Sequence, residues 1–159
     1  MSGVATALLL IASASGQQFG SLDPLPSKGR QYVSFTAEQQ VIAANKPAVL
    51  ELRFHVNEGF HVNSHTPKSE LMVSTRIEFQ PASDVRLTAA EYPPGRELTF
   101  SFDPGEKLEV YSDVFVVKVP VVASSGTHEV KGTLIYQACN RAACYPTRNL
   151  PLSILFNAR

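Results

Sequence analysis

A strict alternation of apolar and polar residues in AVLELRFHV (48–56) constrains the fold of this chain more than any other feature. In an extended chain, successive side chains point to opposite sides, so a period of two is typical of a β-strand with one face in a core. We therefore expect one face of this strand to build the core and the other face, which includes His55, to be exposed. The predicted core residues are Leu50, Leu52, Phe54 and Val56.

Further segments have the same strand character and are separated by clusters of Pro, Gly, Asn and Ser, which favour turns. They are 31–37, 74–80, 84–92, 113–123, 128–138 and 150–156. Only TAEQQVIAANK (36–46) has a helix-like composition. Six or seven short strands at regular spacing predict an all-β chain that folds as an antiparallel β-sandwich, for which immunoglobulin-like topology is the commonest solution at this size.

The N-terminal residues predict a processing segment rather than part of the fold. Residues 4–14 form an apolar run that is too short to span a bilayer, and Ala12-Ser13-Ala14 fits a cleavage site, although no Lys or Arg precedes the run. We expect residues 1–16 to be a signal segment, 17–30 a linker or N-terminal arm, and 31–159 a single domain. Export would place the cysteines where disulfides persist.

The charge balance argues against nucleic acid and anionic membranes as partners. Lys plus Arg and Asp plus Glu number 14 each, and there is no long run of like charge. Electrostatic binding to phosphate groups requires an excess of basic residues. Proteins or small molecules are the expected partners, and the mature chain is expected to have no stable membrane insertion.

The two cysteines, Cys139 and Cys144, lie in YQACNRAACYPTRNLPL (136–152). The strands predicted on either side are close in sequence and are expected to pair as a hairpin, which would put both cysteines in a loop at an exposed end of the sandwich. A disulfide that closes so small a ring would stabilise the fold by only about 2 kcal/mol. The position therefore suits a structural brace poorly.

A metal clip and a redox pair are the other interpretations. The chain has His55, His61, His65 and His128, but a C-x4-C pair without a second cysteine pair does not fit the usual zinc sites, so we expect no metal or cofactor. Those histidines are expected at the surface or at its rim. An exposed pair could exchange with a partner, although there is no C-x-x-C and only Arg141 and Arg148 are nearby cations. The residues alone leave a structural disulfide and a redox pair open.

The cysteine segment resembles the signature of the N-terminal periplasmic domain of the thiol:disulfide interchange protein DsbD. The matching residues are Tyr136, Gln137, Cys139, Cys144, Tyr145, Pro146, Pro151 and Leu152. The segments GFHVNSHTP (59–67) and YPPGRELTFSFDPGEKLEVYSDVFVVKVPV (92–121) are also similar to that family, and the similarity runs from about residue 31 to 156.

The resemblance implies an immunoglobulin-like sandwich whose cysteine pair relays electrons in the periplasm, reduced by a thioredoxin-like partner and reducing other periplasmic proteins. Carried over by position, Cys144 forms mixed disulfides with partners and Cys139 resolves them. The family also shields the pair with an aromatic residue on a cap loop, here expected within 96–108, with Phe100 or Phe102 as the shield. His61 and Asn63 occupy places near the pair in this family, where His61 would tune it.

Two departures from the family pattern lead to an alternative hypothesis. The loop between the cysteines is one residue shorter than in the best known members, and the sequence ends at Arg159 without the family's transporter and terminal thioredoxin-like domains. We therefore expect a free-standing domain of this type. The alternative is an exported immunoglobulin-like module that binds proteins and whose disulfide is static.

Overall fold

The computed structural model describes residues 29–69, 71–100 and 103–159, which form twelve β-strands. The strands are β1 (Val33–Thr36), β2 (Gln40–Ile42), β3 (Ala48–Val56), β4 (His61–Asn63), β5 (Arg76–Phe79), β6 (Val85–Leu87), β7 (Arg96–Phe100), β8 (Asp103–Tyr111), β9 (Val114–Ala123), β10 (Gly126–Tyr136), β11 (Ala138–Cys139) and β12 (Arg148–Ala158). There is no helix among these described residues, and hence none there with the length and apolar character to cross a membrane.

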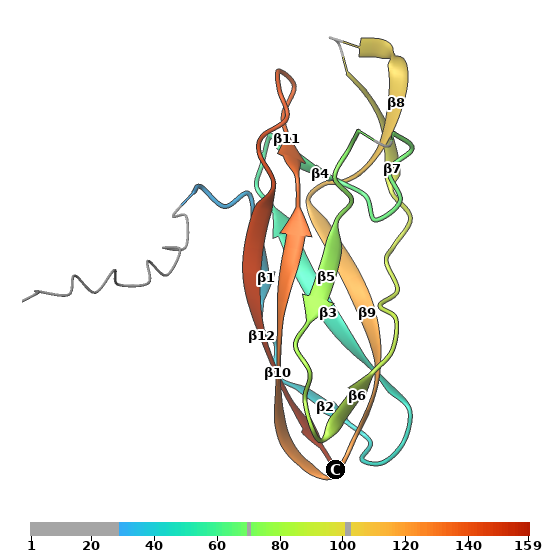
Figure 1. Ribbon diagram of the computed structural model, residues 1–159, viewed down its shortest axis with the longest axis vertical. Coiled ribbons are helices and arrows are strands. Elements are labelled where there is room, and N and C mark those ends of the chain that lie inside the picture. The colour runs from blue at the N-terminus through green and yellow to red at the C-terminus, as the bar shows by residue number, and fades with distance from the viewer. Residues whose placement is uncertain (1–28, 70, 101–102) are drawn as a thin grey trace, which may run out of the picture.

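Two four-stranded sheets form the layers of a sandwich, and a third sheet extends one end of it (Figure 1). One layer has the order β1-β3-β9-β6 and the other β2-β12-β10-β5. The third sheet, β11-β4-β8-β7, lies at the end opposite the C-terminus in Figure 1. All pairings are antiparallel except the short parallel pairing of β2 with β12. The predicted immunoglobulin-like antiparallel sandwich is confirmed.

The core lies between the two layers and follows the alternation seen in the sequence. The exposed fractions of Leu50, Leu52, Phe54 and Val56 are 1%, 0%, 0% and 7%. In the facing layer, alternate residues of β10 and β12 are buried in the same way, and His55 on the outer face of β3 is exposed, as predicted. The two layers pack together because the long strands of both sheets bury their apolar faces against each other, which removes apolar surface from water.

The helix-like segment 36–46 contains the strand β2 instead of a helix. Residues Gln40–Ile42 add to the edge of β12, and the side chain of Gln40 exchanges hydrogen bonds with the backbone of Glu51 on β3. The segment is too short and lacks the apolar stripe that would let a helix bury a face. Pairing at the edge of the sheet gives the backbone N–H and C=O groups of this segment hydrogen-bond partners that a short, unpacked helix would not hold.

The expected strands do not include β4, β7 or β8, and they overlap β11 only at Ala138; these four strands form the third sheet. The range 96–108, expected to be a loop, forms β7 and the first part of β8. Residues 1–16 and nearly all of the expected arm 17–30 lie outside the described residues.

Candidate active site

The cysteine pair lies beyond the end of the β10–β12 hairpin, as the sequence predicts. β10 and β12 stay in register from Gly126 opposite Ala158 to Tyr136 opposite Arg148. Beyond that point, the backbone N–H of Tyr145 donates to the carbonyl of Ala138 at 2.8 Å.

The last rung of this ladder places the two sulfurs together. Cys139 and Cys144 are directly opposite each other, and the N–H of Asn140 donates to the carbonyl of Ala143 at 2.9 Å on their far side. This makes the cysteines a non-hydrogen-bonded antiparallel pair, the arrangement in which side chains approach most closely. They form a disulfide with a Cα–Cα distance of 4.0 Å.

The two cysteines differ in access. Cys139 is 0% exposed, because it belongs to β11, which pairs with His61 and Val62 of β4. Cys144 is only half-buried and packs with Cys139 against Leu108 and Val110, so it is the more exposed residue of the pair. The expectation that both cysteines lie at an exposed tip is wrong for Cys139, because β4, distant in sequence, covers it.

Asn140 organises the turn between the cysteines. Its Oδ1 accepts hydrogen bonds from the backbone N–H groups of Ala142 and Ala143 at 2.8 and 2.9 Å, and its Nδ2 donates to the hydroxyl of Tyr145 at 2.8 Å. Asn favours such turns because its short side chain reaches the backbone two and three residues ahead. One side chain therefore holds the turn together independently of the disulfide.

An aromatic cluster lies next to Cys144 and consists of Tyr32, Phe60 and Tyr145. The ring centroids are 4.7 Å apart for Tyr32 and Phe60 and 5.0 Å apart for Tyr32 and Tyr145. The guanidinium of Arg30 lies over the rings of Tyr32 and Phe60. Pro146, which follows Tyr145, is exposed.

Tyr136 and Gln137 connect the hairpin to other parts of the chain. The hydroxyl of the fully buried Tyr136 accepts from the N–H of Tyr32 at 3.0 Å and donates to Oε1 of Gln31 at 2.7 Å. Burial raises the pKa of Tyr136, so its hydroxyl keeps its proton. Oε1 of Gln137 accepts from Nδ2 of Asn63 at 3.1 Å, which fixes β4 against the start of the cysteine segment.

His61 is a buried neighbour of the pair rather than a surface residue. It is directly opposite Cys139 and only 6% exposed, because the third sheet encloses it. Burial lowers the pKa of His61, which favours the neutral ring. With Phe60 and Arg141 it also lines a hollow of about 520 Å³ between the cysteine loop and β7.

The shield residue of the expected cap loop stays a prediction. Phe100 is the last residue of β7, but its side chain is outside the described part of the structure, and Phe102 lies outside the described residues altogether.

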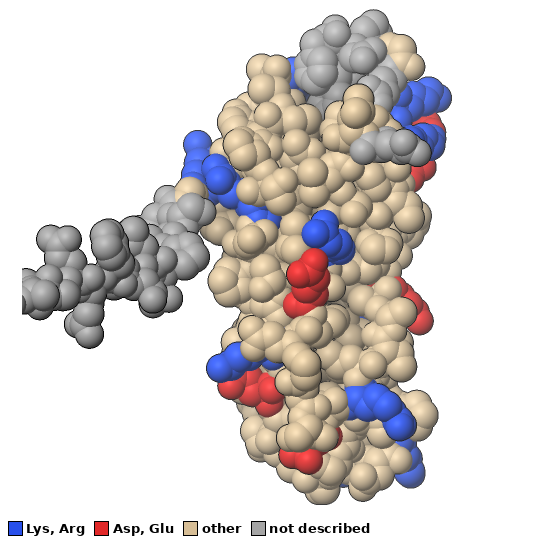
Figure 2. All heavy atoms as spheres, in the orientation of Figure 1, with Lys and Arg blue, Asp and Glu red and all other residues tan. Residues whose placement is uncertain are grey.

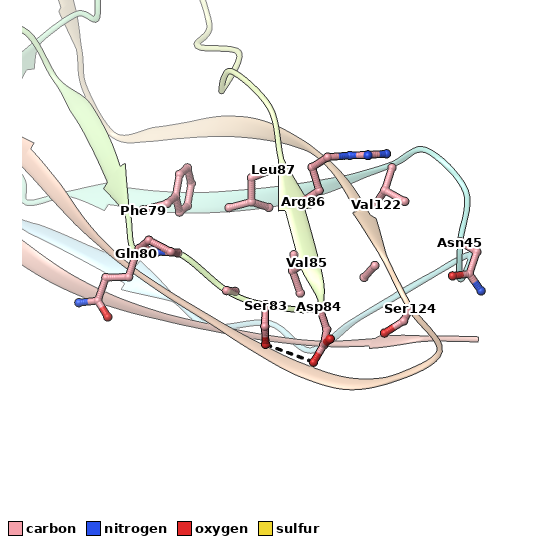
Figure 3. Close-up of a pocket in the computed structure, with 13 residues that line it drawn as sticks. Asn45, Phe79, Gln80, Ser83, Asp84, Val85, Arg86, Leu87, Val122 and Ser124 are labelled. Atoms are coloured by element: carbon pink, nitrogen blue, oxygen red, sulfur yellow. Dashed lines mark hydrogen bonds between the residues drawn. The ribbon is translucent and has the colours of Figure 1, made fainter.

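A second hollow, of about 660 Å³, lies at the opposite end of the sandwich between the β5–β6 segment and β9 (Figure 3). Its charged side chains, Asp84 and Arg86, point away from each other in Figure 3, and its lining includes no Cys or His. No group of three or more metal-ligating side chains occurs anywhere in the described residues. Among the described residues, the reactive chemistry is therefore at the disulfide.

Several residues at the site were missed by sequence reasoning. Asn140 carries a turn signal, Asn followed by small residues, that could have been recognised. The contribution of Arg30, Tyr32 and Phe60 could not, because they reach the cysteines only through the packing of the sheets.

The fold and the site together define a class: an immunoglobulin-like sandwich with a disulfide at one end, formed by a buried and a half-buried cysteine. The family model described as "Thiol:disulfide interchange protein DsbD, N-terminal" matches residues 30–151, and the chain belongs to this family. The family and the Cys139–Cys144 disulfide support thiol–disulfide exchange as its activity. Comparison with curated proteins gives no match.

Solved structures of related domains are similar to the chain. The N-terminal periplasmic domain of ScsB from Proteus mirabilis is 15% identical with a TM-score of 0.53, over 77% of this chain and 44% of that one, so this chain spans less than half of it. The reduced DsbD N-terminal domain of Neisseria meningitidis is 22% identical with a TM-score of 0.46, over 68% of this chain and 77% of that one.

A third similar structure is the complex between the DsbD N-terminal and PilB N-terminal domains from Neisseria meningitidis. It is 19% identical with a TM-score of 0.48, over 82% of this chain and 87% of the matched one. At these identities the likenesses concern the fold alone.

Proposed function

We propose that this domain relays electrons in the periplasm by thiol–disulfide exchange, with Cys144 as the sulfur that partners attack and Cys139 as the resolving cysteine. The observation that carries this assignment is the difference in access: Cys144 is half-buried, whereas Cys139 is 0% exposed. Attack on a disulfide requires a thiolate to approach one sulfur along the line of the bond that breaks. The greater exposure of Cys144 among these two residues supports it as the sulfur that is attacked, since the third sheet covers Cys139.

The domain is reduced in two exchange steps. A partner thiolate attacks Sγ of Cys144, the Cys139–Cys144 bond breaks, and the electron pair leaves with Cys139, which takes up a proton. A second partner thiolate then attacks the partner's sulfur in the mixed disulfide and releases Cys144 as a thiolate that is also protonated. The domain gains two electrons and two protons, and the partner becomes a disulfide.

The reduced domain then reduces an acceptor protein by the same two exchange steps in the opposite order. The thiolate of Cys144 attacks the acceptor's disulfide, and Cys139 then displaces the reduced acceptor and restores the Cys139–Cys144 bond. Tyr136 and Gln137 would hold the base of the loop through their hydrogen bonds to Tyr32 and Asn63. We propose thioredoxin-fold proteins as both donor and acceptors, since their accessible dithiols suit this chemistry.

Trapping the mixed disulfide tests the assignment. A thioredoxin whose resolving cysteine is replaced by Ser is incubated with the oxidised domain, and the linked species is digested and sequenced. We expect the linkage at Cys144. The Cys139→Ser variant is first converted at Cys144 to a mixed disulfide with 5-thio-2-nitrobenzoate. The thiolate of the same thioredoxin should then displace thionitrobenzoate and give the same adduct, whereas Cys144→Ser, treated in the same way, serves as the matched control and should give none.

The reduction potential tests the function as a whole. A relay must exchange with its partners, so equilibration with glutathione should give measurable amounts of both forms. A potential below about −300 mV together with no trapped adduct would identify a static disulfide, and the domain would then be a binding module.

A further inference from the structure

Two arginines lie in the cysteine segment and a third packs on an aromatic neighbour of that segment, and none of the three is paired with an acid among the described residues. Arg30, Arg141 and Arg148, here called the arginine rim, have no carboxylate within 4.0 Å among the described residues. The neighbouring β7–β8 hairpin is different, because Arg96 there contacts Asp113 at 3.1 Å. The charge of Arg96 is therefore neutralised by a carboxylate, whereas the charges of the three rim arginines are not.

Two members of the rim are tied directly to the cysteine loop. Arg141 lies in the turn between the cysteines, is exposed, and lines the same hollow as Phe60 and His61. Arg30 reaches Phe60 from another direction, with its guanidinium carbon 5.5 Å from the ring centroid. The two arginines thus approach Phe60 from segments far apart in the sequence.

Arg148 completes the rim. It opens β12 directly after the cysteine segment, opposite Tyr136. Its guanidinium packs so closely on Gly29 that a Cβ placed there would be 2.9 Å from Cζ, which brings it beside the chain that carries Arg30. Figure 2 shows blue Lys and Arg atoms grouped, with no red between them, where the described chain begins.

The stacking of Arg30 on aromatic rings keeps it at the surface without neutralising it. A cation over a ring is attracted to the negative face of that ring but keeps its full charge. Glu58, exposed in the turn that precedes Gly59 and Phe60, is the described carboxylate in this turn, and it forms no ion pair with the rim. The described chain next to the cysteine turn therefore carries an aromatic cluster and an excess of positive charge.

We propose that the arginine rim selects redox partners whose reactive cysteines are flanked by carboxylates. This inference rests on the proposed function, since it concerns the approach of a partner to Cys144. Complementary charge raises the rate of encounter and orients the partner before the sulfurs meet. Cations close to a cysteine also favour its thiolate, the form that attacks. The occupant is thus a thioredoxin-fold protein with an acidic surface around its dithiol.

Two small disulfides of opposite charge test this selection. The reduced domain is mixed with 5,5′-dithiobis(2-nitrobenzoate), which carries two carboxylates, or with cystamine, which carries two ammonium groups. In each case the thiolate of Cys144 displaces one thiol of the reagent, and Cys139 displaces the other as the domain disulfide forms. We expect the ratio of the anionic to the cationic rate to fall about three- to tenfold in Arg30→Gln/Arg141→Gln, and also on raising salt from 10 to 500 mM.

Arg86→Gln is the matched control, because Arg86 is exposed, unpaired among the described residues, and lines the hollow at the opposite end. It removes one charge, as does Arg141→Gln alone, so these two single variants are compared with each other: the ratio should fall in Arg141→Gln and stay unchanged in Arg86→Gln. If the ratio of the anionic to the cationic rate is equal in the wild type and in the rim variant, or falls as much in Arg86→Gln as in Arg141→Gln, the proposed selection by the arginine rim is wrong. Failure of both reagents to oxidise the pair would instead count against the proposed function.

Discussion

The side chain of Asn140 is expected to set how readily the dithiol closes to a disulfide. In the oxidised domain the covalent bond keeps the turn closed. After reduction the turn depends on the hydrogen bonds from Ala142 and Ala143 to Oδ1 of Asn140 and on one backbone bond from Asn140 to Ala143. Replacing Asn140 with Ala should therefore loosen the reduced loop more than the oxidised one.

The magnitude follows from the bonds that are lost. Ala142 and Ala143 are exposed, so water partly replaces each bond, and each contributes about 0.5–1 kcal/mol. The two bonds that close the turn, without the third lost bond from Nδ2 to Tyr145, total about 1–2 kcal/mol, which corresponds to an equilibrium that changes about 5- to 30-fold in favour of the dithiol. For a two-electron couple this makes the reduction potential about 20–45 mV less negative.

Equilibration with glutathione buffers, with the two forms separated by alkylation and mass, measures this shift. Asn140→Asp keeps an oxygen acceptor at the same place and should shift the potential much less. Tyr145→Phe removes only the hydroxyl partner of Nδ2 and tests that bond separately. A potential for Asn140→Ala that stays within the error of the wild type, or an equal shift in Asn140→Asp, would refute the reasoning.

Two further predictions concern buried groups around the site. Burial lowers the pKa of His61 from its ordinary 6.5, so the unfolded chain binds a proton first, and the free energy of unfolding should fall as pH drops below about 6.5 towards the folded pKa. Urea titrations from pH 7.5 to 5 should show this decline. If the decline is equally large in His61→Gln, His61 is not the group responsible. Tyr136→Phe keeps the ring but leaves the buried N–H of Tyr32 without its acceptor. The free energy of unfolding should therefore fall by about 1–3 kcal/mol in the same titrations at pH 7.5. A decrease below the experimental error would show that this bond contributes nothing.

The parts of the fold that were predicted correctly are those encoded by local pattern. The alternation in 48–56 identifies β3 and its buried face, and the short connection between 128–138 and 150–156 predicts the hairpin that holds the cysteines. In the third sheet, β4 and β11 were missed because they have only three and two residues, whereas β7 and β8, with five and nine, were missed because 96–108 was expected to be a cap loop. Strands as short as β4 and β11 have too few residues to show a period, and they exist only because they pair with each other.

Local patterns in the amino-acid sequence were enough to predict that the chain is built from strands, that Cys139 and Cys144 lie close together beyond one hairpin, and which family the chain resembles. Periodicity and motif are local properties and can be read without knowing what packs where. Tertiary contacts were needed to show that β4 buries Cys139 while Cys144 is half-buried, and that Arg30 packs on Phe60, which lines a hollow with Arg141. These relations depend on contacts between segments far apart in the chain, which form only when the sheets bury their apolar faces against one another.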